Sequence, residues 1–476
     1  MKYPTIAAAA KALRAGETTA VELVEDSLGL SRGLNEQLGM FLSSYEEQAL
    51  AQASATDQAL SQGEDPGPLA GIPLGIKDII STAEGATTAQ SLVLDRAWGD
   101  GDAVVIRRLK AAGGIVTGKL TTMEFAIGLP DEEKPFPLPR NPWNPEHWTG
   151  GSSSGSGSSV ASGSVLGALG TDTAGSIRIP AAYCGITGLM GTLGRVPKSG
   201  CVPLGYSLDH IGPMARTAED CAIMMTALAG HDESDLTSID APTTDYTAEL
   251  TGDLTGVTIG VDRLGWTSST PEDPALEGTF LQAVADLEAR GASIQEIELP
   301  LYHEMTTANL IIMFSEALAY HRPDLQKRWT DYGRATRLMI SSGAFYGAAD
   351  YVQAQRARTV GRKAIGEVFD RVDLVVTPTA GLGAPSYDDL NSMVTGSLRG
   401  RMDRVYTPYW NVVGNPVISV PMGFSSSGLP LGMQIAARPF DEALVLRAAD
   451  SFQRQTTWHE RVPESLAGSA AEEVLV

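Results

Sequence analysis

The stretch that decides the fold is residues 150–178, GGSSSGSGSSVASGSVLGALGTDTAGSIR. Its first half is almost entirely Gly and Ser, a composition typical of flexible linkers. The run nevertheless continues without a polar break into an apolar segment that begins at Val165. Small side chains at such density also describe a helix packed closely on a sheet, because they permit close approach of the backbone. Composition alone leaves both interpretations open.

Two motif matches in and near this stretch are weak. Residues 151–155 fit the G-x-S-x-G nucleophile elbow around Ser153, but that elbow needs a strand entering it. The preceding residues 141–148 contain two prolines, which exclude a central strand. Residues 113–119, GGIVTGK, fall one residue short of a phosphate-binding P-loop, and a helix precedes them where a strand is required. We reject both matches and expect Lys119 to lie at a strand end.

Strands and helices alternate on both sides of this stretch. Short apolar runs predict strands, and apolar residues at helical spacing predict helices. The predicted strands are 72–80, 114–120, 257–261, 372–378, 417–421 and 432–436, and the predicted helices include one starting at residue 20 and those at 48–62, 102–112, 274–290, 348–370 and 441–455. Residues 129–148 are rich in Pro, Trp and Asn and are predicted to be a loop without regular structure. The alternation favours the α/β class, and the absence of a clean linker favours one large domain.

Composition and charge exclude several function classes. The 476 residues include 57 acidic and 35 basic ones, a formal charge of −22. Such a surface repels phosphate backbones and lipid head groups, so we expect neither nucleic acid nor membrane as a partner. No apolar run reaches the roughly 18 residues of a membrane-spanning helix, and the first residues do not resemble a signal peptide. Cys184, Cys201 and Cys221 lack metal-site spacing. We predict a cytoplasmic protein that needs no metal or other cofactor.

Three separated segments carry residues suited to nucleophilic catalysis. Lys77 is a lone lysine in the apolar run 72–80, Ser152 follows two glycines, and Ser176 closes the turn TDTAGS. A serine hydroxyl is a poor nucleophile at neutral pH and needs an adjacent base. A lysine is such a base only when burial keeps its amine neutral. Strand alternation directs Asp78 to the face opposite Lys77, away from that amine.

These segments resemble the amidase signature family. Its members carry a lysine in a GIKD-like strand, a GGSSGG-like loop and a TDTGGSIR-like turn, which correspond to residues 75–78, 150–155 and 171–178. Other similar segments are 180–189, 194–197, 207–217, 411–421 and 428–434. Each motif alone is modest, but several in the family's order and spacing identify the chain as a member.

The resemblance implies a fold. It is a single large α/β/α layered domain spanning residues 1–476, built around a central mixed, mostly parallel twisted β-sheet. Its expected parts are N-terminal helices (1–62), a signature core with the catalytic residues (71–225), a mainly helical middle segment that contributes to the substrate pocket (230–370), and C-terminal strands and a helix (371–476).

The resemblance also implies catalytic roles. Ser176 is the nucleophile, Ser152 follows a cis peptide bond and relays the proton, and Lys77 is the ultimate acid and base. The backbone N–H groups of Thr173, Ala174, Gly175 and Ser176 form the oxyanion hole, and Ser153, Asp172 and Arg178 support the site. This sequence departs from the family pattern at Ala174 and Ser154, which replace glycines. Neither change removes a catalytic group.

The substrate pocket is less defined by the sequence. By analogy it involves the loop 123–127, the loop 130–148 and the middle segment near 300–350. The residues named for it are Met123, Phe125, Gly150 and Gly151, and the aromatic candidates are Phe136, Trp143, Phe314, Phe345 and Tyr346. We expect most of these aromatic residues to be ordinary core or rim residues. Cys184 is expected to be a small buried thiol and His210 a hydrogen-bonded structural residue.

Three hypotheses about function follow. The first is an amidohydrolase that cleaves the C–N bond of a small-molecule carboxamide, aryl amide or hydrazide, or a carbamate or urea, through an acyl-enzyme on Ser176. The second is the glutaminase subunit of a tRNA-dependent amidotransferase; such relatives carry an acid before the Thr-Pro segment, where this chain has Arg404. The third is a catalytically dead binding protein, which the retention of all three catalytic residues disfavours. The oligomeric state is not defined by the sequence, and a homodimer is the commonest default.

Overall fold

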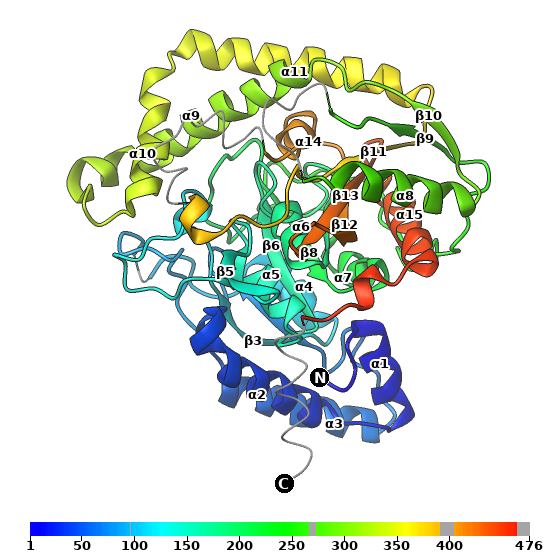
Figure 1. Cartoon of the computed structure of the whole chain (residues 1–476). Coiled ribbons are helices and arrows are strands. Elements are labelled where there is room, and N and C mark those ends of the chain that lie inside the picture. The colour runs from blue at the N-terminus through cyan, green and yellow to red at the C-terminus, as the bar shows by residue number, and fades with distance from the viewer. Residues whose placement is uncertain (96, 266–272, 391–403, 464–476) are drawn as a thin grey trace.

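A computed structural model describes residues 1–95, 97–265, 273–390 and 404–463 (Figure 1). Residues 266–272 of the predicted middle segment, and 391–403 and 464–476 of the predicted C-terminal segment, lie outside the described residues. Among the described residues, the main sheet has eleven strands in the order β1-β3-β2-β6-β8-β7-β12-β13-β11-β9-β10, and β4 and β5 form a separate sheet. None of the described helices is long and apolar enough to cross a bilayer.

The strands are β1 Phe41–Ser44, β2 Pro73–Lys77, β3 Ile115–Leu120, β4 Arg140–Asn141, β5 Asn144–Trp148, β6 Gly167–Asp172, β7 Thr187–Met190, β8 His210–Ala215, β9 Thr258–Val261, β10 Ser293–Glu296, β11 Leu374–Pro378, β12 Val417–Phe424 and β13 Pro430–Ala437. The described α-helices are α1 Ile6–Ala15, α2 Ala20–Leu38, α3 Glu46–Ser61, α4 Val104–Ala111, α5 Ser154–Ala161, α6 Arg178–Cys184, α7 Ala218–Leu228, α8 Leu276–Ala289, α9 Tyr302–Arg328, α10 Arg334–Ser342, α11 Ala348–Phe369, α14 Pro408–Val413 and α15 Glu442–Gln455. Every strand and helix predicted above has a counterpart among them.

The predicted α/β/α domain with a mixed central sheet is confirmed. Strands β3, β2 and β6 are parallel, as are β11, β9 and β10, whereas pairing from β6 through to β11 is antiparallel. Parallel pairing is therefore confined to the two flanks and is less prevalent than we expected. The cause is local: β8 inserts between β6 and β7, and a short hairpin joins β12 to β13, which fixes an antiparallel pair.

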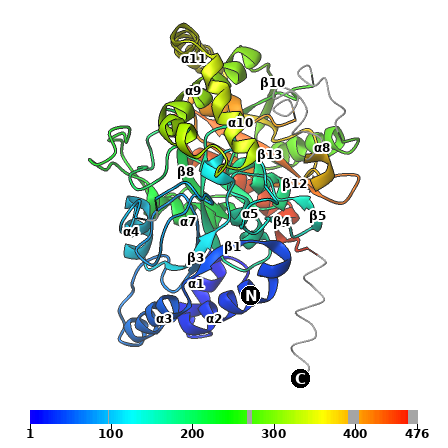
Figure 2. The ribbon, with the colours of Figure 1, turned by 90° about the vertical axis from the view of Figure 1, so that its left-hand side faces the viewer.

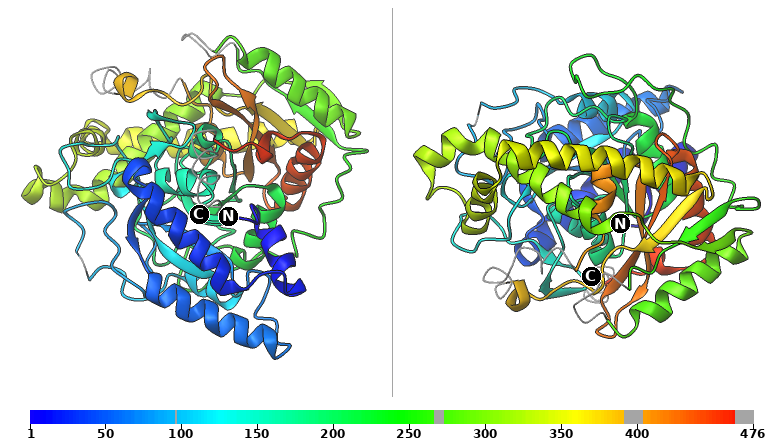
Figure 3. Two further views of the ribbon diagram at one scale, coloured as in Figure 1. Left: turned by 60° about the horizontal axis from the view of Figure 1, so that its bottom comes forward. Right: turned by 90° about the horizontal axis from the view of Figure 1, so that it is seen from above.

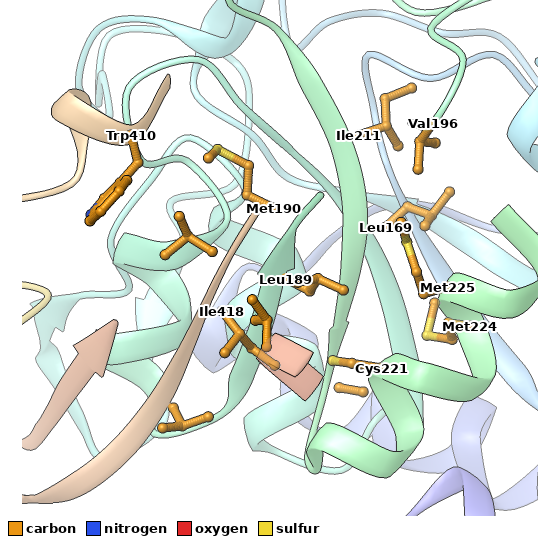
Figure 4. Packing of buried hydrophobic residues seen from close by; sticks show 14 of the residues in the cluster. Leu169, Leu189, Met190, Val196, Ile211, Cys221, Met224, Met225, Trp410 and Ile418 are labelled. Carbon is orange, nitrogen blue, oxygen red and sulfur yellow. The ribbon is translucent and has the colours of Figure 1, made fainter. Parts of the chain in front are cut away.

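The two faces of the sheet are covered by different helices. On β6, Ala168 packs in a cluster with residues of α5 and α6, whereas its neighbour Leu169 packs in the cluster that contains α7 and α15. Successive strand residues point to opposite faces, so the two clusters lie on opposite sides of the sheet. Figure 4 shows Leu169 beside Met224 and Met225 of α7.

Helices α1, α2 and α3 gather at one end of the molecule, and α9, α10 and α11 gather at the other (Figures 1 and 2). Seen from above, α9 and α11 run beside each other across that second end (Figure 3).

The Gly/Ser stretch is not a linker. It forms helix α5, in which every residue is buried. A Cβ atom at Gly155 would collide with the backbone of Met40 and Thr121, and one at Gly157 would press on Pro180. The close-packing interpretation is therefore confirmed, and its physical reason is the short distance between α5 and its neighbours.

The prediction of an irregular loop over 129–148 is partly wrong, because β4 and β5 form a hairpin there. The Asn141 side chain accepts a hydrogen bond from Trp143 N–H and donates one to the carbonyl of Tyr183. The first bond folds the turn and the second ties it to the core. Pro145 is tolerated in β5 because only Asn144 and Trp148 of this strand pair with β4. The strand that precedes residues 151–155 is β5, which lies outside the central sheet. These residues therefore do not follow a central strand, as a nucleophile elbow would.

Candidate active site

Lys77 is the last residue of β2, in the sheet between β3 and β6, and its side chain is fully buried. Its Nζ atom lies 2.7 Å from Ser152 Oγ, 3.0 Å from Ser153 Oγ and 2.7 Å from Thr171 Oγ1. The lysine predicted as the base therefore contacts the serine predicted as the relay.

The surroundings of Lys77 favour an uncharged amine. Burial lowers the pKa of Lys77 to about 7, against the opposing influence of Cys201, Asp172 and Asp209. Its three contacts are hydroxyl groups rather than carboxylates. The Ser153 hydroxyl donates to the carbonyl of Thr171, so it accepts from Lys77. A neutral amine offers two N–H donors and one lone pair, so three hydroxyl contacts fit it when one of the others donates to nitrogen.

The adjacent acid, Asp78, is neutralised elsewhere. As predicted from strand alternation, its carboxylate points away from Lys77, and it lies 3.3 Å from Nζ of the buried Lys119. The Lys119 ammonium also donates to the carbonyl of Ile80 at 2.6 Å. Lys119 is the penultimate residue of β3, which confirms its predicted place at a strand end. Because Asp78 has its own cation, it does not hold a proton on Lys77.

Ser152 and Ser176 are held next to each other through their backbones. The peptide bond between Gly151 and Ser152 is cis. The Ser152 carbonyl accepts hydrogen bonds from Met123 N–H at 3.1 Å and from Thr122 Oγ1 at 2.9 Å. Ser153 N–H donates to the carbonyl of Ser176 at 3.2 Å. Ser152 and Ser176 line the same cavity, described below.

A buried ion pair fixes the turn that carries Ser176. Asp172 and Arg178 are both fully buried and are joined by two hydrogen bonds of 3.0 Å. Burial alone would raise the pKa of Asp172, but the charge of Arg178 and hydrogen bonds from Arg178 and Asn411 outweigh it and lower the pKa to about 2. Arg178 also donates to Gln434, which lies on β13. Asp172 and Arg178, expected to support the site, thus form a buried pair rather than a surface one.

The same carboxylate occupies part of the predicted oxyanion hole. Gly175 N–H donates to Asp172 Oδ1 at 2.7 Å, which leaves the N–H groups of Thr173, Ala174 and Ser176 as candidate donors. The positive φ of this turn falls on Gly175, at 130°, so alanine at position 174 needs no left-handed backbone. At the other departure from the family pattern, the Ser154 hydroxyl donates to the carbonyl of Gly150.

Ser152 and Ser176 open into a cavity of about 340 Å³, hereafter the serine cavity. Its lining comes from the loops after β3, from β5, from the turn after β6, from α6, from α9 and α10, and from segments late in the chain. The lining residues are Met123, Ala126, Ile127, Gly128, Leu129, His147, Trp148, Gly151, Ser152, Thr173, Ala174, Ser176, Ile179, Tyr183, Leu204, Asp273, Met313, Met339, Leu382, Gly383, Ala384, Pro385, Asp389, Leu390, Arg404, Val405, Ser427 and Leu429.

Of the residues named in advance for the pocket, Met123 and Gly151 line the serine cavity, whereas Phe125 and Gly150 do not. Phe125 has a positive φ of 52° and turns into the core, where its ring contacts His321 and Tyr332. The carbonyl of Gly150 is taken up by neighbouring hydroxyls.

None of the five aromatic candidates lines the serine cavity. As expected, they are core or rim residues: Phe314 is fully buried, for example, and Phe345 is 88% exposed. The aromatic rings that do line the cavity are those of Trp148, Tyr183 and His147, and sequence reasoning did not single them out. Two of them end β5, a strand that was not predicted.

The remaining predicted structural residues behave as expected. Cys184 is fully buried, its thiol donates to the carbonyl of Thr149, and burial raises its pKa. His210 contacts the carbonyl of Asp172 through Nδ1, and burial lowers its pKa to about 4. In the part of the chain that the structure describes, no cluster of His, Cys, Asp and Glu has the arrangement of a metal site.

Comparisons with known proteins define the class of enzyme. The model of the Amidase family matches residues 22–446. A relative from Chloroflexus aggregans, named as one of the subunits of glutamyl-tRNA(Gln) amidotransferase, is 40% identical over 98% of this chain and 99% of its own. A solved structure described as a vestigial protein complex that reveals the origins of an s-triazine catabolic enzyme superposes with a TM-score of 0.87, at 31% identity over 94% of this chain and 98% of that one. The peptide amidase of Stenotrophomonas maltophilia superposes with a TM-score of 0.82, at 28% identity over 97% of this chain and 98% of its own.

A layered α/β fold with a buried lysine beside serines defines an amidase signature enzyme, a class that acts on carbon–nitrogen bonds. The chain belongs to the amidase signature family.

Proposed function

We propose that this protein cleaves the C–N bond of a linear amide through an acyl-enzyme on Ser176. Ser176 Oγ attacks the carbonyl carbon, and its proton passes through Ser152 Oγ to the neutral Nζ of Lys77. The tetrahedral oxyanion is stabilised by backbone N–H groups of Thr173, Ala174 and Ser176. When it collapses, the C–N bond breaks, and Lys77 returns the proton through Ser152 to the leaving amine.

Water completes the reaction. It attacks the acyl ester and gives up a proton along the same route, and the ester bond to Ser176 breaks. The carboxylic acid leaves, and Ser176 recovers its proton from Lys77 through Ser152. One amide and one water thus give one acid and one amine.

The observation that supports this proposal most directly is the contact of 2.7 Å between Lys77 Nζ and Ser152 Oγ at a fully buried amine. A lysine with a pKa of about 7 is matched to proton transfer at neutral pH. A purely structural lysine would be expected to pair with a carboxylate, as Lys119 does with Asp78.

A fluorophosphonate probe tests the assignment of the nucleophile. Its phosphorus should bond to Ser176 Oγ with loss of fluoride, at a rate that falls below pH 7 as Lys77 takes up a proton. Trypsin should release residues 141–178 as one peptide, since no lysine or arginine lies between Arg140 and Arg178. Fragmentation of this peptide in a mass spectrometer then separates an adduct on Ser176 from one on Ser152. An adduct on Ser152, or labelling that persists in Ser176→Ala, would overturn the proposal, and no labelling at all would favour a catalytically dead protein.

A second candidate function is the glutaminase subunit of a tRNA-dependent amidotransferase. The observation that favours it is the 40% identity, over nearly the full length of both chains, to a protein named as part of such an enzyme. In that case the substrate is glutamine, and the chain works in a complex with other subunits rather than as a homodimer. A tRNA-linked role would also run against our expectation, from the net charge of −22, that nucleic acid is not a partner.

Hydrolysis by the purified chain separates the two candidates. We expect release of ammonia or amine from members of a panel of primary amides, anilides, hydrazides, carbamates and ureas, because Ser176 lines the serine cavity. Glutamine turnover that exceeds turnover of every other panel member would support the glutaminase instead. Activity that appears only when partner subunits are added would have the same meaning.

A further inference from the structure

The serine cavity is mostly apolar, and the two acids among its described lining residues, Asp273 and Asp389, already accept hydrogen bonds from the protein. The Asp273 carboxylate accepts hydrogen bonds from the N–H groups of Ala275 and Ser426 and from the Ser426 hydroxyl. The Asp389 carboxylate accepts from the hydroxyl of Ser386 at 2.8 Å. These acids are therefore tied to the protein rather than directed at a ligand.

Among the described residues that line this cavity, Arg404 is the cation, and its guanidinium has no partner within the described ranges. It forms no hydrogen bond or ion pair with any side chain or backbone group in the described ranges, although it is partly buried at the cavity wall. Its backbone, in contrast, is fixed: Gly381 N–H donates to the carbonyl of Arg404 at 3.1 Å, and Ala380 and Val405 form a β-bridge. A fixed backbone that carries an unused guanidinium is an arrangement suited to an anion.

Tyr183 adds a second donor to the same wall. Its ring is 4% exposed, and its hydroxyl has no hydrogen-bond partner within the described residues. Burial raises the pKa of Tyr183 to about 12, and the charge of Arg404 opposes that rise, as a nearby cation does. The phenol therefore keeps its proton at neutral pH and can donate it to a ligand oxygen.

Both donors are tied to the catalytic turn. Tyr183 lies on α6, which begins two residues after Ser176. Thr407, three residues after Arg404, donates a hydrogen bond to the carbonyl of Ala174 at 2.6 Å. A ligand group bound by Arg404 and Tyr183 would thus have a fixed position relative to Ser176, in the same cavity and not at a separate surface site.

We propose that Arg404 and Tyr183 bind a carboxylate carried by the substrate, so that the enzyme acts on anionic amides. This inference rests on the proposed amide cleavage and adds the charge of the substrate to it. The same chemistry fits a carboxylate on the acyl part or on the amine part, and the substrates chosen below distinguish the two.

Matched pairs of amides test the inference. On the acyl side, monoamides of succinic, glutaric and adipic acid are compared with their methyl esters. On the amine side, N-acetyl-4-aminobenzoate is compared with its methyl ester. We expect the wild type to prefer the acid in one of the two series. Arg404→Gln should lower kcat/KM for that acid by about 10- to 100-fold and leave its ester within about threefold, because a hydrogen bond to a charged group is lost only with the acid.

Two further variants sharpen the result. Arg404→Glu should reverse the preference between acid and ester, because like charges then meet in the cavity. Arg356→Gln removes the same charge from an exposed position on α11 and should leave both substrates unaffected. A loss in Arg356→Gln equal to that in Arg404→Gln would trace the effect to net charge and would overturn the inference.

Binding measured without turnover separates this inference from the proposed function. Calorimetry on Ser176→Ala should show tighter binding of the preferred acid than of its ester, and Arg404→Gln in that background should remove the difference. If wild type hydrolyses amides but binds and cleaves acids and esters alike, the inference fails and the proposed function stands. If acids bind through Arg404 but no amide is cleaved, the proposed function fails and the carboxylate site stands.

Discussion

Replacing Ser176 by alanine is expected to lower kcat/KM for amide cleavage by about 10⁴- to 10⁶-fold. Both Ser152 and Ser176 line the serine cavity, and Ser176 is the more exposed of the two. Ser152 is only 3% exposed, and its hydroxyl is held by the amine at 2.7 Å. The turn itself should survive, because Ser153 N–H contacts the Ser176 carbonyl, which alanine retains. Initial rates with a panel substrate, measured at enzyme concentrations high enough to detect the residual rate, give the ratio.

A matched control for this variant is Ser156→Ala. Ser156 is a buried serine of α5 whose hydroxyl donates to the carbonyl of Leu169, so its loss tests the packing of the core and not the chemistry. We expect Ser156→Ala to keep kcat/KM within about tenfold of wild type. Its free energy of unfolding should be lower by about 1 kcal/mol. Residual activity of Ser176→Ala within tenfold of wild type would contradict the role of Ser176.

The position of the candidate catalytic residues was predictable because the signals that define them are local. A lysine inside an apolar strand predicts burial, and burial accounts for its lowered pKa. Ser152, Ser153 and Ser176 lie within one stretch of chain, and the short helix α5 and strand β6 between them return the chain to the same edge. A short connection of this kind leaves little freedom in how the segments that carry Ser152 and Ser176 meet.

The ion pairs around the site were predictable only in part. Asp78 was expected to face away from Lys77, but its partner Lys119 lies on a different strand, and only the parallel register of β2 with β3 brings them together. The pair of Asp172 and Arg178 was recognised from the turn motif. Its burial depends on Asn411 and Gln434, which come from the other end of the chain. No local pattern reports such contacts.

The cavity was the least predictable part. Much of its wall comes from residues 382–390 and 404–405, which are separated from Ser176 by more than two hundred positions. Phe125 was named for the pocket from its position along the chain, but its backbone has a positive φ and its ring contacts His321 and Tyr332 in the core. The sequence identified Arg404 only as the position where glutaminase relatives carry an acid. Its place on the wall of the serine cavity is defined by the structure alone.

Replacing Lys77 by methionine is expected to lower kcat/KM near pH 7.5 by about 10²- to 10⁴-fold, the usual contribution of a positioned general base. Methionine is unbranched and apolar, so it fills much of the same buried space without an amine. In the wild type, kcat/KM should fall tenfold per pH unit below about pH 7, because a protonated Lys77 accepts no proton. In Lys77→Met this limb should be absent, and the rate should instead rise with hydroxide concentration up to high pH.

Unfolding measured across the same pH range shows that the lost activity is not a lost fold. The pKa of Lys77 is about 7 in the folded protein and has a reference value of 10.5. Between these values the unfolded chain binds a proton that the folded protein does not, so wild-type stability rises with pH. Methionine has no such dependence. The difference in unfolding free energy should therefore shift in favour of Lys77→Met as the pH falls from 10 to 7, by at most about 4 kcal/mol.

These two measurements bear on the base separately. A wild-type pH–rate profile in Lys77→Met would mean that another group accepts the proton of Ser176. Stability that shifts with pH in the opposite direction would mean that Lys77 is charged in the folded protein, and a charged ammonium cannot act as the base. Only an amine that is neutral in the folded protein accounts for both results. It explains why wild-type kcat/KM falls at low pH, and why Lys77→Met gains stability relative to wild type as the pH falls. Because a surface lysine or an ion-paired one gives neither, the combination distinguishes a base from a structural cation.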